Sequence, residues 1–329
     1  MNKVKNIKIL YYGGGWPTNI GNAFIDLGAM AILHAAVPNA HVTFASEMPR
    51  WFFSSGAKRS QILKSRRFQF WGGEQTIEEP IQDNALDIAT VTDCDLVVFS
   101  GMAMCEEFVR VNGPTILSLS SRGVPVLLLG TGALEYSQPE KRLYGDFLRK
   151  VKPVGFVSRD DRSYEMFADY VPQAQKGIDC GFFVLEAYTP FPLVLPAYIV
   201  ATFDSTPEPA LDLKERQMIR AHHDCWTPLN KEQTSTANTL ISDIPYDYLA
   251  LYANAEEVHS DRVHACVAAL AYGRHARLYH PTPRGSLFDA VGAYDIRDKL
   301  VKLDLGLLKR KKKSQIEFTQ QVITECVRG

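Results

Sequence analysis

Short apolar runs alternate with segments of helical periodicity along the first half of the chain. Apolar runs of strand length cover residues 7–12, 41–46, 95–100, 124–130 and 155–158, and helical spacing marks residues 22–36, 114–122, 139–151 and 161–170. An uninterrupted apolar run such as 124–130 is typical of a parallel strand that helices cover on both faces. The pattern therefore predicts an α/β domain with a Rossmann-like parallel sheet.

This alternation is interrupted between residues 185 and 196, where three prolines occur. Proline is unfavourable inside helices and central strands, so the stretch is interpreted as a linker. We expect an N-terminal domain at residues 1–186 and a C-terminal domain at residues 187–329.

A second, smaller series of elements follows the linker. Strands are predicted at 198–203, 257–260 and 276–280, and helices at 213–223, 245–254 and 262–272, whereas residues 226–242 have too little periodicity for an assignment. Apolar residues at Ile316, Ile323 and Val327 predict a final amphipathic helix at 315–327 that crosses back over the first domain. The expected fold class is α/β, with two facing Rossmann-like domains and a C-terminal helix.

Two such domains bring the carboxyl ends of their strands together at a cleft. We expect four loops to converge there, at residues 13–22, 100–107, 158–162 and 260–264. Gly13, Gly14 and Gly15 either permit close approach of the backbone to an anion or sugar, or simply form a sharp turn. They do not form a GxGxxG motif, so they are weak evidence for a dinucleotide site.

Composition limits the class of protein further. The 329 residues are 46% hydrophobic and 22% charged, with a formal net charge of -1, which is typical of a soluble globular protein and argues against nucleic-acid binding. The six cysteines form no CxxC pair, so they indicate neither a disulfide framework nor a zinc knuckle and favour a reducing cytoplasm. Neither a signal peptide nor an apolar run of about 18 residues is found.

Two polar clusters allow more than one interpretation. A basic cluster consists of Lys309, Arg310, Lys311, Lys312 and Lys313. It forms either a solvated loop or a peripheral contact with an anionic membrane surface. A cluster of candidate metal ligands consists of His222, His223, Asp224 and Cys225. No second ligand cluster accompanies it, so it is interpreted as the polar end of the helix at 213–223.

The strongest functional signal lies at residues 258–273. Arg262 and His264 stand between a strand and an alanine-rich helix that stops at Gly273. The free N–H groups and the positive dipole end of that helix therefore lie near both side chains, which favours a small, multiply charged anion. The alternatives are that Arg262 pairs with Asp261 or caps a carbonyl group, and that His264 is an ordinary core histidine.

These segments resemble the polysaccharide pyruvyl transferase family, whose members share a GT-B-like arrangement of two facing Rossmann-type domains. The resemblance covers most of the chain and rests above all on Ser260-Asp261-Arg262-Val263-His264, where the family has Ser-x-Arg-Leu-His before a small-residue helix. Further matching segments are residues 19–22, 95–101, 124–132, 158–160 and 179–182.

The resemblance implies a ketal-forming transferase. Phosphoenolpyruvate would be the donor, and a sugar of a cell-surface glycan or of its lipid-linked precursor would be the acceptor, with the first domain on the acceptor side and the second on the donor side. His264 and Arg262 would be catalytic, and His264 would either hold the phosphate or protonate the terminal enol carbon. The substrate-binding residues would be Arg159, Arg262, Val263, His264, Gly15, Asn19 and Asn22. The resemblance implies no cofactor and no metal.

One departure from the family bears on the mechanism. The family's first loop usually reads Asn-x-Gly-Asp, whereas this chain has Asn19-Ile20-Gly21-Asn22, and an amide cannot act as a base. Either Asp26, one turn further on, is the catalytic base, or Asn22 acts only by hydrogen bonding. The alternative for Asp26 is a solvent-facing helix residue.

Two other functions fit the same pattern. A sugar-nucleotide-dependent glycosyltransferase would bind a diphosphate with Arg262 and use Glu106, Glu107 or Asp26 as its base. A non-catalytic glycan-binding protein would retain the fold without the reaction, and Asn22 is the feature that favours it.

Overall fold

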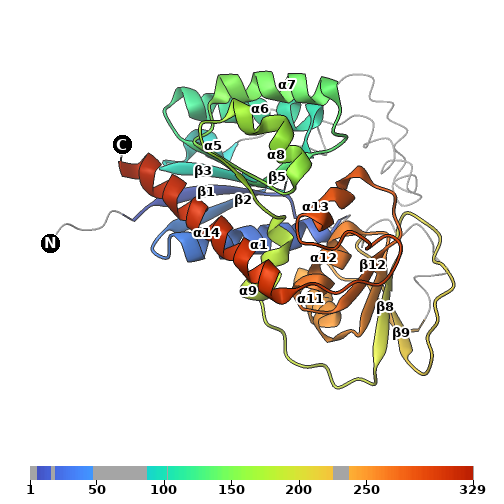
Figure 1. The fold of residues 1–329 in the computed structure, drawn as a ribbon. Helices are drawn as coiled ribbons and strands as arrows, with labels where there is room; N and C mark the ends of the chain where they lie inside the picture. Colours follow the sequence, from blue (N-terminus) through green and yellow to red (C-terminus); the bar gives the residue numbers. More distant parts are fainter. Residues whose placement is uncertain (1–5, 16–18, 47–86, 102, 225–236, 329) are drawn as a thin grey trace, which may run out of the picture.

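The computed structural model describes residues 6–15, 19–46, 87–101, 103–224 and 237–328, and these form two parallel β-sheets (Figure 1). The first sheet has seven strands in the order β2-β1-β3-β5-β6-β7, with β4 paired to β5. Its strands are β1 (Lys8–Gly13), β2 (His41–Ser46), β3 (Leu96–Ser100), β4 (Ala103–Met104), β5 (Val126–Ala133), β6 (Gly155–Ser158) and β7 (Ala174–Lys176). The strand order reverses between β1 and β3, which makes this the switch point of the first sheet.

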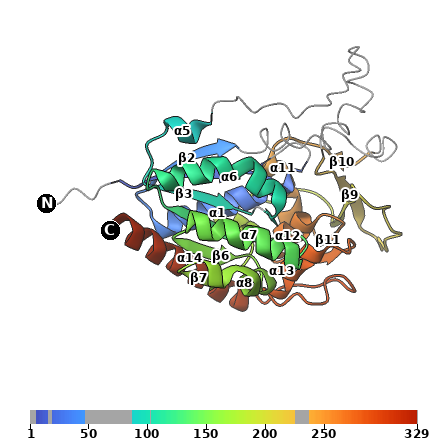
Figure 2. The ribbon, with the colours of Figure 1, turned by 90° about the horizontal axis from the view of Figure 1, so that it is seen from above.

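Helices cover both faces of the first sheet, as the apolar character of its strands requires. α1 (Gly21–Ala36) and α14 (Leu305–Arg328) lie on one face, and α5 (Ile88–Val91), α6 (Glu106–Ser121) and α7 (Gln138–Val151) lie on the other (Figures 1 and 2). The short helices α8 (Asp161–Phe167) and η1 (Ala168–Tyr170) follow β6. Each face therefore has its own apolar core.

The second sheet has five strands in the order β10-β9-β8-β11-β12, again all parallel. Its elements are β8 (Tyr198–Thr202), β9 (Gln217–Ala221), β10 (Thr239–Leu240), α11 (Pro245–Asn254), β11 (Glu257–Ser260), α12 (Val263–Ala271), β12 (His275–Leu278), η3 (Pro283–Gly285) and α13 (Ser286–Asp289). Here the order reverses between β8 and β11. A ligand site is expected where the loops after these two strands diverge.

The two sheets share one continuous apolar core. η2 (Cys180–Phe183) and α9 (Val184–Ala187) follow the first sheet, and η2 packs against both α1 and α12. Gly28 of α1 lies so close to η2 that a Cβ there would stand 1.8 Å from the carbonyl oxygen of Cys180. α14 adds two polar contacts at this junction, because Lys312 pairs with Glu186 at 2.8 Å and the side chain of Gln315 accepts the Ile178 N–H. The predicted architecture of two facing Rossmann-like domains with a C-terminal helix is confirmed.

The prediction of a helix at residues 213–223 is wrong. Residues 217–221 form strand β9, which pairs in parallel with β8 and β10. Their side chains are good helix formers, but pairing between two neighbouring strands outweighs this local preference. His222 and His223 consequently stand at the carboxyl end of a strand and not at a helix end.

Two further boundaries differ from the prediction. Pro114 was expected near the start of a helix, but it lies inside α6, which begins at Glu106. Burial of Phe108, Ile116 and Leu119 on one face stabilises this helix across the proline. The basic cluster at residues 309–313 is not a loop either, because α14 already begins at Leu305 and Lys312 is buried within it.

The close contact at Gly28 leads to a stability prediction. Gly28→Ala should lower the free energy of unfolding by roughly 3 kcal/mol, because the added methyl group forces α1 away from η2. Urea unfolding measures this change. Gly113→Ala in α6 is the matched control, since its Cβ would meet side-chain atoms only at 3.5 and 3.6 Å, and it should be neutral or stabilising. Equal effects of the two variants would contradict the proposed packing constraint.

Candidate functional site

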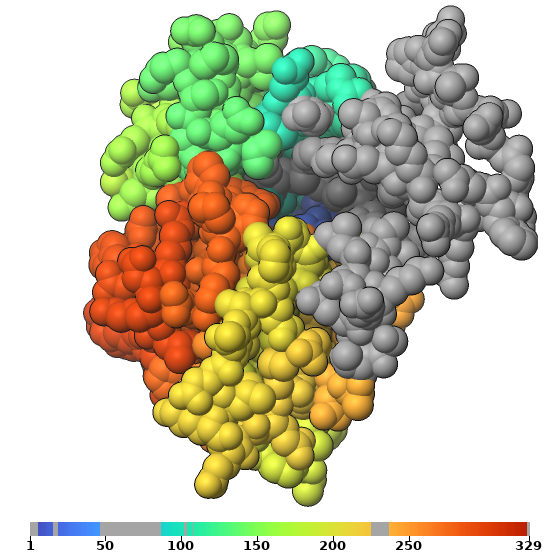
Figure 3. Space-filling model, turned by 90° about the vertical axis from the view of Figure 1, so that its right-hand side faces the viewer, coloured from blue at the N-terminus to red at the C-terminus, as the bar shows by residue number. Residues whose placement is uncertain are grey.

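A polar pocket opens at the carboxyl end of the second sheet, at its switch point. Its walls come from the loops after β8, β9, β11 and β12, together with one residue of the first domain, and consist of Asn19, Ser205, His223, Asp261, Arg262, Val263, His264, His280, Thr282 and Arg284. In the space-filling view a groove runs between the first domain, green, and the second, orange and yellow, with N-terminal residues in blue between them (Figure 3).

The N-terminus of α12 faces this pocket. Its N-cap residue is Arg262, which has an extended backbone and follows the end of β11 by two residues, and no side chain caps the first turn. The N–H groups of a first helical turn have no partner within the helix, and they lie at the positive end of its dipole. Val263 and His264 belong to that turn and line the pocket. The local structure is therefore that of an anion site.

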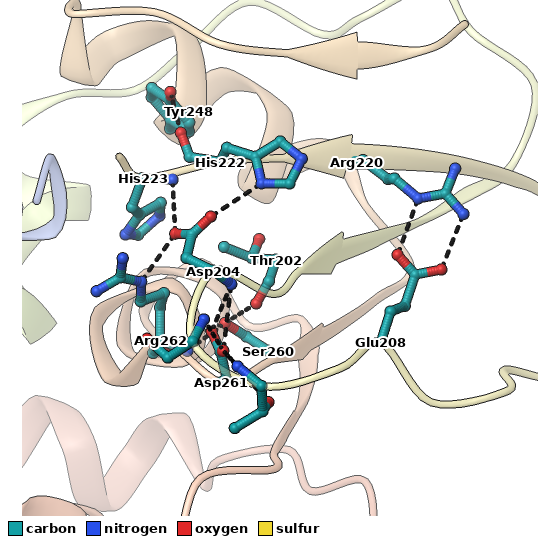
Figure 4. A network of polar contacts seen from close by, with 12 residues as sticks. Thr202, Asp204, Glu208, Arg220, His222, His223, Tyr248, Ser260, Asp261 and Arg262 are labelled. Atoms are coloured by element: carbon teal, nitrogen blue, oxygen red, sulfur yellow. Dashed lines mark hydrogen bonds and ion pairs between the residues drawn. The ribbon is translucent and has the colours of Figure 1, made fainter. Parts of the chain in front are cut away.

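Asp261 organises the loop after β8. Its carboxylate accepts hydrogen bonds from the backbone N–H groups of Asp204, Ser205 and Thr206, at 2.6–3.2 Å. Arg262 does not pair with Asp261; its Nε instead donates to Oδ2 of Asp204 at 2.8 Å (Figure 4). The interpretation of Arg262 as the partner of Asp261 is wrong, because three amides already occupy that carboxylate.

Asp204 holds Arg262 in one orientation. Its other oxygen contacts Nδ1 of His222 at 2.9 Å, and Oδ2 also accepts the backbone N–H of His223 at 3.0 Å (Figure 4). Burial disfavours the charged carboxylate, but the hydrogen bond with His222 and the charge of Arg262 outweigh it and lower the pKa of Asp204 to about 2. The Arg262 side chain is 23% exposed and only its Nε is bonded within the described residues. Both terminal nitrogens remain available for a ligand.

His264 lies beside a buried carboxylate. Its Nε2 is 3.7 Å from Oδ2 of Asp179, which belongs to the turn before η2 and is completely buried. Burial again opposes the charge, but the neighbouring His264 overcomes it and holds the pKa of Asp179 below its usual value. His264 is therefore more than a core histidine, because it combines a charged partner with a place in the pocket wall.

His223 is a pocket residue that the sequence analysis assigned only to the polar end of a helix. Its ring is completely buried, Nε2 lies 2.7 Å from the Tyr252 hydroxyl, and its carbonyl oxygen accepts the N–H of Ile20 from the first domain. Burial lowers the pKa of His223 to about 3, so the ring is neutral. The signal was present in the adjacent histidines, but the assignment of a helix at 213–223 concealed their place at a strand end.

The first domain reaches the pocket through the start of α1. Asn19 lines the pocket and donates to the side-chain oxygen of Asn22 at 3.1 Å. A Cβ on Gly21 would stand 2.9 Å from Cβ of His264 and 3.1 Å from Nδ1 of His223. Glycine at this position therefore lets α1 pack directly onto both histidines.

Asp26 and Gly15 lie away from the pocket wall. Asp26 is 7% exposed, so the interpretation of a solvent-facing residue is wrong. Its carboxylate accepts the Tyr11 hydroxyl and the N–H groups of Gly14 and Gly15. Burial raises the pKa of Asp26 to about 6. This side chain shapes the glycine loop, and its role as a base remains a prediction.

Arg159 also lies behind the pocket wall. It is 2% exposed, and its Nη2 donates to the carbonyl oxygen of Ala133 at 2.6 Å. Its Nε is 3.7 Å from a carboxylate oxygen of Asp160. The charge of Arg159 nevertheless acts on Arg284 in the pocket wall. Direct contact of Arg159 with a substrate remains a prediction.

Possible metal ligands do not gather within the described part of the chain. No group of three or more His, Cys, Asp or Glu side chains there is arranged to hold an ion. No described helix is long and apolar enough to span a membrane.

The fold and the pocket together define a GT-B-type protein with a polar pocket at the uncapped N-terminus of α12 in its second domain. Comparison with protein families makes the assignment more specific, because the polysaccharide pyruvyl transferase model matches residues 19–278. The chain belongs to the polysaccharide pyruvyl transferase family. No curated protein matches the chain.

Solved structures show the same fold at low sequence identity. The UDP-N-acetylglucosamine 2-epimerase of Methanocaldococcus jannaschii, solved with UDP-N-acetylglucosamine and UDP, is 11% identical with a TM-score of 0.51, over 98% of this chain and 100% of that one. A protein of Listeria monocytogenes described as a candidate UDP-N-acetylglucosamine 2-epimerase is 12% identical with a TM-score of 0.51, over 97% of this chain and 91% of that one.

Neutral, buried His223 leads to a prediction about pH. The unfolded chain binds a proton at this residue below about pH 6.5, whereas the native ring stays neutral down to about pH 3. Each pH unit below 6.5 should therefore lower the free energy of unfolding by up to about 1.4 kcal/mol. Urea unfolding of His223→Gln between pH 7 and 5 should show a shallower slope than the native chain.

Asp26 should change the pH dependence of the free energy of unfolding in the opposite direction, which provides an internal check. Because its pKa is raised to about 6, the native state binds a proton that the unfolded state releases above about pH 4. Its contribution to stability is therefore lost as the pH rises from 4 to 6, and Asp26→Asn should steepen the profile. Parallel profiles for the native chain and both variants would refute these assignments.

Proposed function

We propose that this protein transfers the pyruvate group of phosphoenolpyruvate to a sugar of a glycan or of its lipid-linked precursor, forming a pyruvate ketal. The observation that carries the proposal is the site formed by Arg262, His264 and the uncapped N-terminus of α12, in a chain of the pyruvyl transferase family. The donor has a phosphate and a carboxylate, and guanidinium groups bind both by paired, charge-assisted hydrogen bonds.

His264 is the proposed acid. It donates a proton to the terminal carbon of the enol, so that the CH₂ group becomes CH₃ and positive charge develops on the central carbon. A sugar hydroxyl oxygen bonds to that carbon, and the bond to phosphate breaks as a second hydroxyl of the same sugar closes the ketal. Of the two hydroxyl protons, one restores His264 and the other leaves on phosphate. The place of His264 in the pocket wall, in the first turn of α12, supports this role.

In this proposal the first domain binds the acceptor sugar. Asn19 stands in the pocket wall and is hydrogen-bonded to Asn22, and these two amides would orient the sugar by hydrogen bonds. Asp26 fits the role of base less well, since its carboxylate is engaged with Tyr11 and the glycine loop. Hydrogen bonding by Asn22 is therefore the preferred of the two expected arrangements.

A sugar-nucleotide donor is the competing proposal. The fold of the epimerase solved with UDP-N-acetylglucosamine is compatible with it. What favours phosphoenolpyruvate is the local spacing of Arg262, Val263 and His264 at the start of α12, in a chain of the pyruvyl transferase family.

The proposal also includes a place at the cytoplasmic face of an anionic membrane, where a lipid-linked acceptor would be reached. Lys309, Arg310 and Lys313 are exposed on α14 and would make the electrostatic contact. Lys312 would not take part, because it is buried in the ion pair with Glu186.

Calorimetric titration with phosphoenolpyruvate, and separately with UDP-N-acetylglucosamine, tests the donor class. The native chain should bind only phosphoenolpyruvate, and Arg262→Gln should weaken binding at least tenfold because a charged pair of hydrogen bonds is lost. His264→Gln should reduce phosphate release in the presence of acceptor by about 100-fold or more, because the proton donor is removed.

Arg220→Gln is the matched control, because both bonding nitrogens of Arg220 are already held by Glu208 (Figure 4). It should bind phosphoenolpyruvate like the native chain. Binding of the nucleotide sugar alone would assign the protein to the glycosyltransferases. Sugar binding with no response to either donor would indicate a non-catalytic glycan-binding protein.

A further inference from the structure

Arg284 is presented to the pocket on a rigid turn after β12. The Thr282 hydroxyl accepts the backbone N–H of Arg284 at 3.3 Å, and Nε of Arg284 lies 3.4 Å from the same oxygen. Arg297 supports the turn from beneath by donating to the Thr282 carbonyl at 2.6 Å. A Cβ on Gly285 would stand 2.0 Å from that guanidinium, so glycine at this position leaves room for Arg297 in its present orientation.

No acidic side chain in the described part of the chain forms an ion pair with Arg284, although Asp179 acts on its charge from further away. Arg284 is half-buried in the pocket wall. Burial, followed by the positive charges of Arg159 and Arg262, lowers the pKa of Arg284 to about 10. A half-buried cation among other cations opposes folding unless an anion joins it. The place of Arg284 in the pocket wall is therefore better explained by binding of an anionic ligand than by a contribution to the stability of the fold.

The pocket's own carboxylates do not supply that anion. Asp261 is bonded to three backbone amides, Asp204 holds Arg262 and His222, and Asp179 stands beside His264. Arg159, which the family resemblance implies as a donor-binding residue, has its guanidinium turned to the Ala133 carbonyl behind the wall. Within the described pocket, Arg284 is the guanidinium that accompanies Arg262 at the surface.

We propose that Arg284 binds the donor directly and, with Arg262, selects a small ligand that carries two anionic groups. This inference rests on the proposed function for the identity of the donor, phosphoenolpyruvate. Arg159 then contributes positive charge from behind the wall, and Arg297 and Thr282 are positioning residues for Arg284. A donor with one anionic group would leave one of the two guanidinium groups without its partner.

Calorimetric titration of phosphoenolpyruvate and of inorganic phosphate into the native chain, Arg284→Gln and Arg284→Lys tests this role. Arg284→Gln should weaken phosphoenolpyruvate binding at least tenfold. The phosphoenolpyruvate affinity of Arg284→Lys should lie between those of the native chain and Arg284→Gln, because lysine keeps the charge but cannot form the paired hydrogen bonds of a guanidinium group. Thermal unfolding without ligand should show Arg284→Gln to be as stable as the native chain or more so, since an uncompensated charge is removed. A purely structural arginine would show the reverse, a loss of stability.

Lys302→Gln, which removes one exposed positive charge from the same domain, is the matched control and should leave binding unchanged. Equal affinity of the native chain and Arg284→Gln for phosphoenolpyruvate would overturn the assignment of Arg284. A different outcome is that the native chain does not bind phosphoenolpyruvate yet binds phosphate with an affinity that Arg284→Gln loses. The donor proposal would then fail while Arg284 remained an anion-binding residue.

Discussion

The ion pair between Arg262 and Asp204 is the interaction on which the geometry of the pocket depends. Asp204 lies after β8 and Arg262 after β11, so the pair spans the point where the loops of the two neighbouring strands diverge. The same carboxylate binds His222 and the backbone of His223, which adds the end of β9. One buried anion thus fixes three strand ends and leaves the outer nitrogens of a guanidinium free for a ligand.

Close packing between the domains places this arrangement against the first domain. Gly21 lets the start of α1 rest on His223 and His264, and Gly28 lets the middle of the same helix rest on η2. η2 follows directly on Asp179, the carboxylate beside His264. A helix of the first domain therefore supports His264 of the second, and small residues at two positions make the contact close enough to do so.

The pocket concentrates positive charge at some expense of stability. Its carboxylates are engaged with amides, imidazoles or Arg262, so they organise the walls without neutralising Arg284. His223 is kept neutral by burial in the same region. Such a distribution is typical of a site adapted to a multiply charged small anion, because bound ligand restores the charge balance that the protein alone leaves incomplete.

The sequence by itself determined the two-domain α/β architecture, since buried parallel strands leave continuous apolar runs such as that of β5. It also located Arg262 and His264, because a strand, a charged pair and a small-residue helix are neighbours along the chain. Only the tertiary structure decided that residues 217–221 form a strand, that Asp26 serves the glycine loop and that Arg159 lies behind the pocket wall. It alone brought Asp204, His223 and Arg284 to Arg262. Those residues are distant in sequence, and which of them meet is set by the order of strands in the sheet, a long-range property that local patterns do not encode.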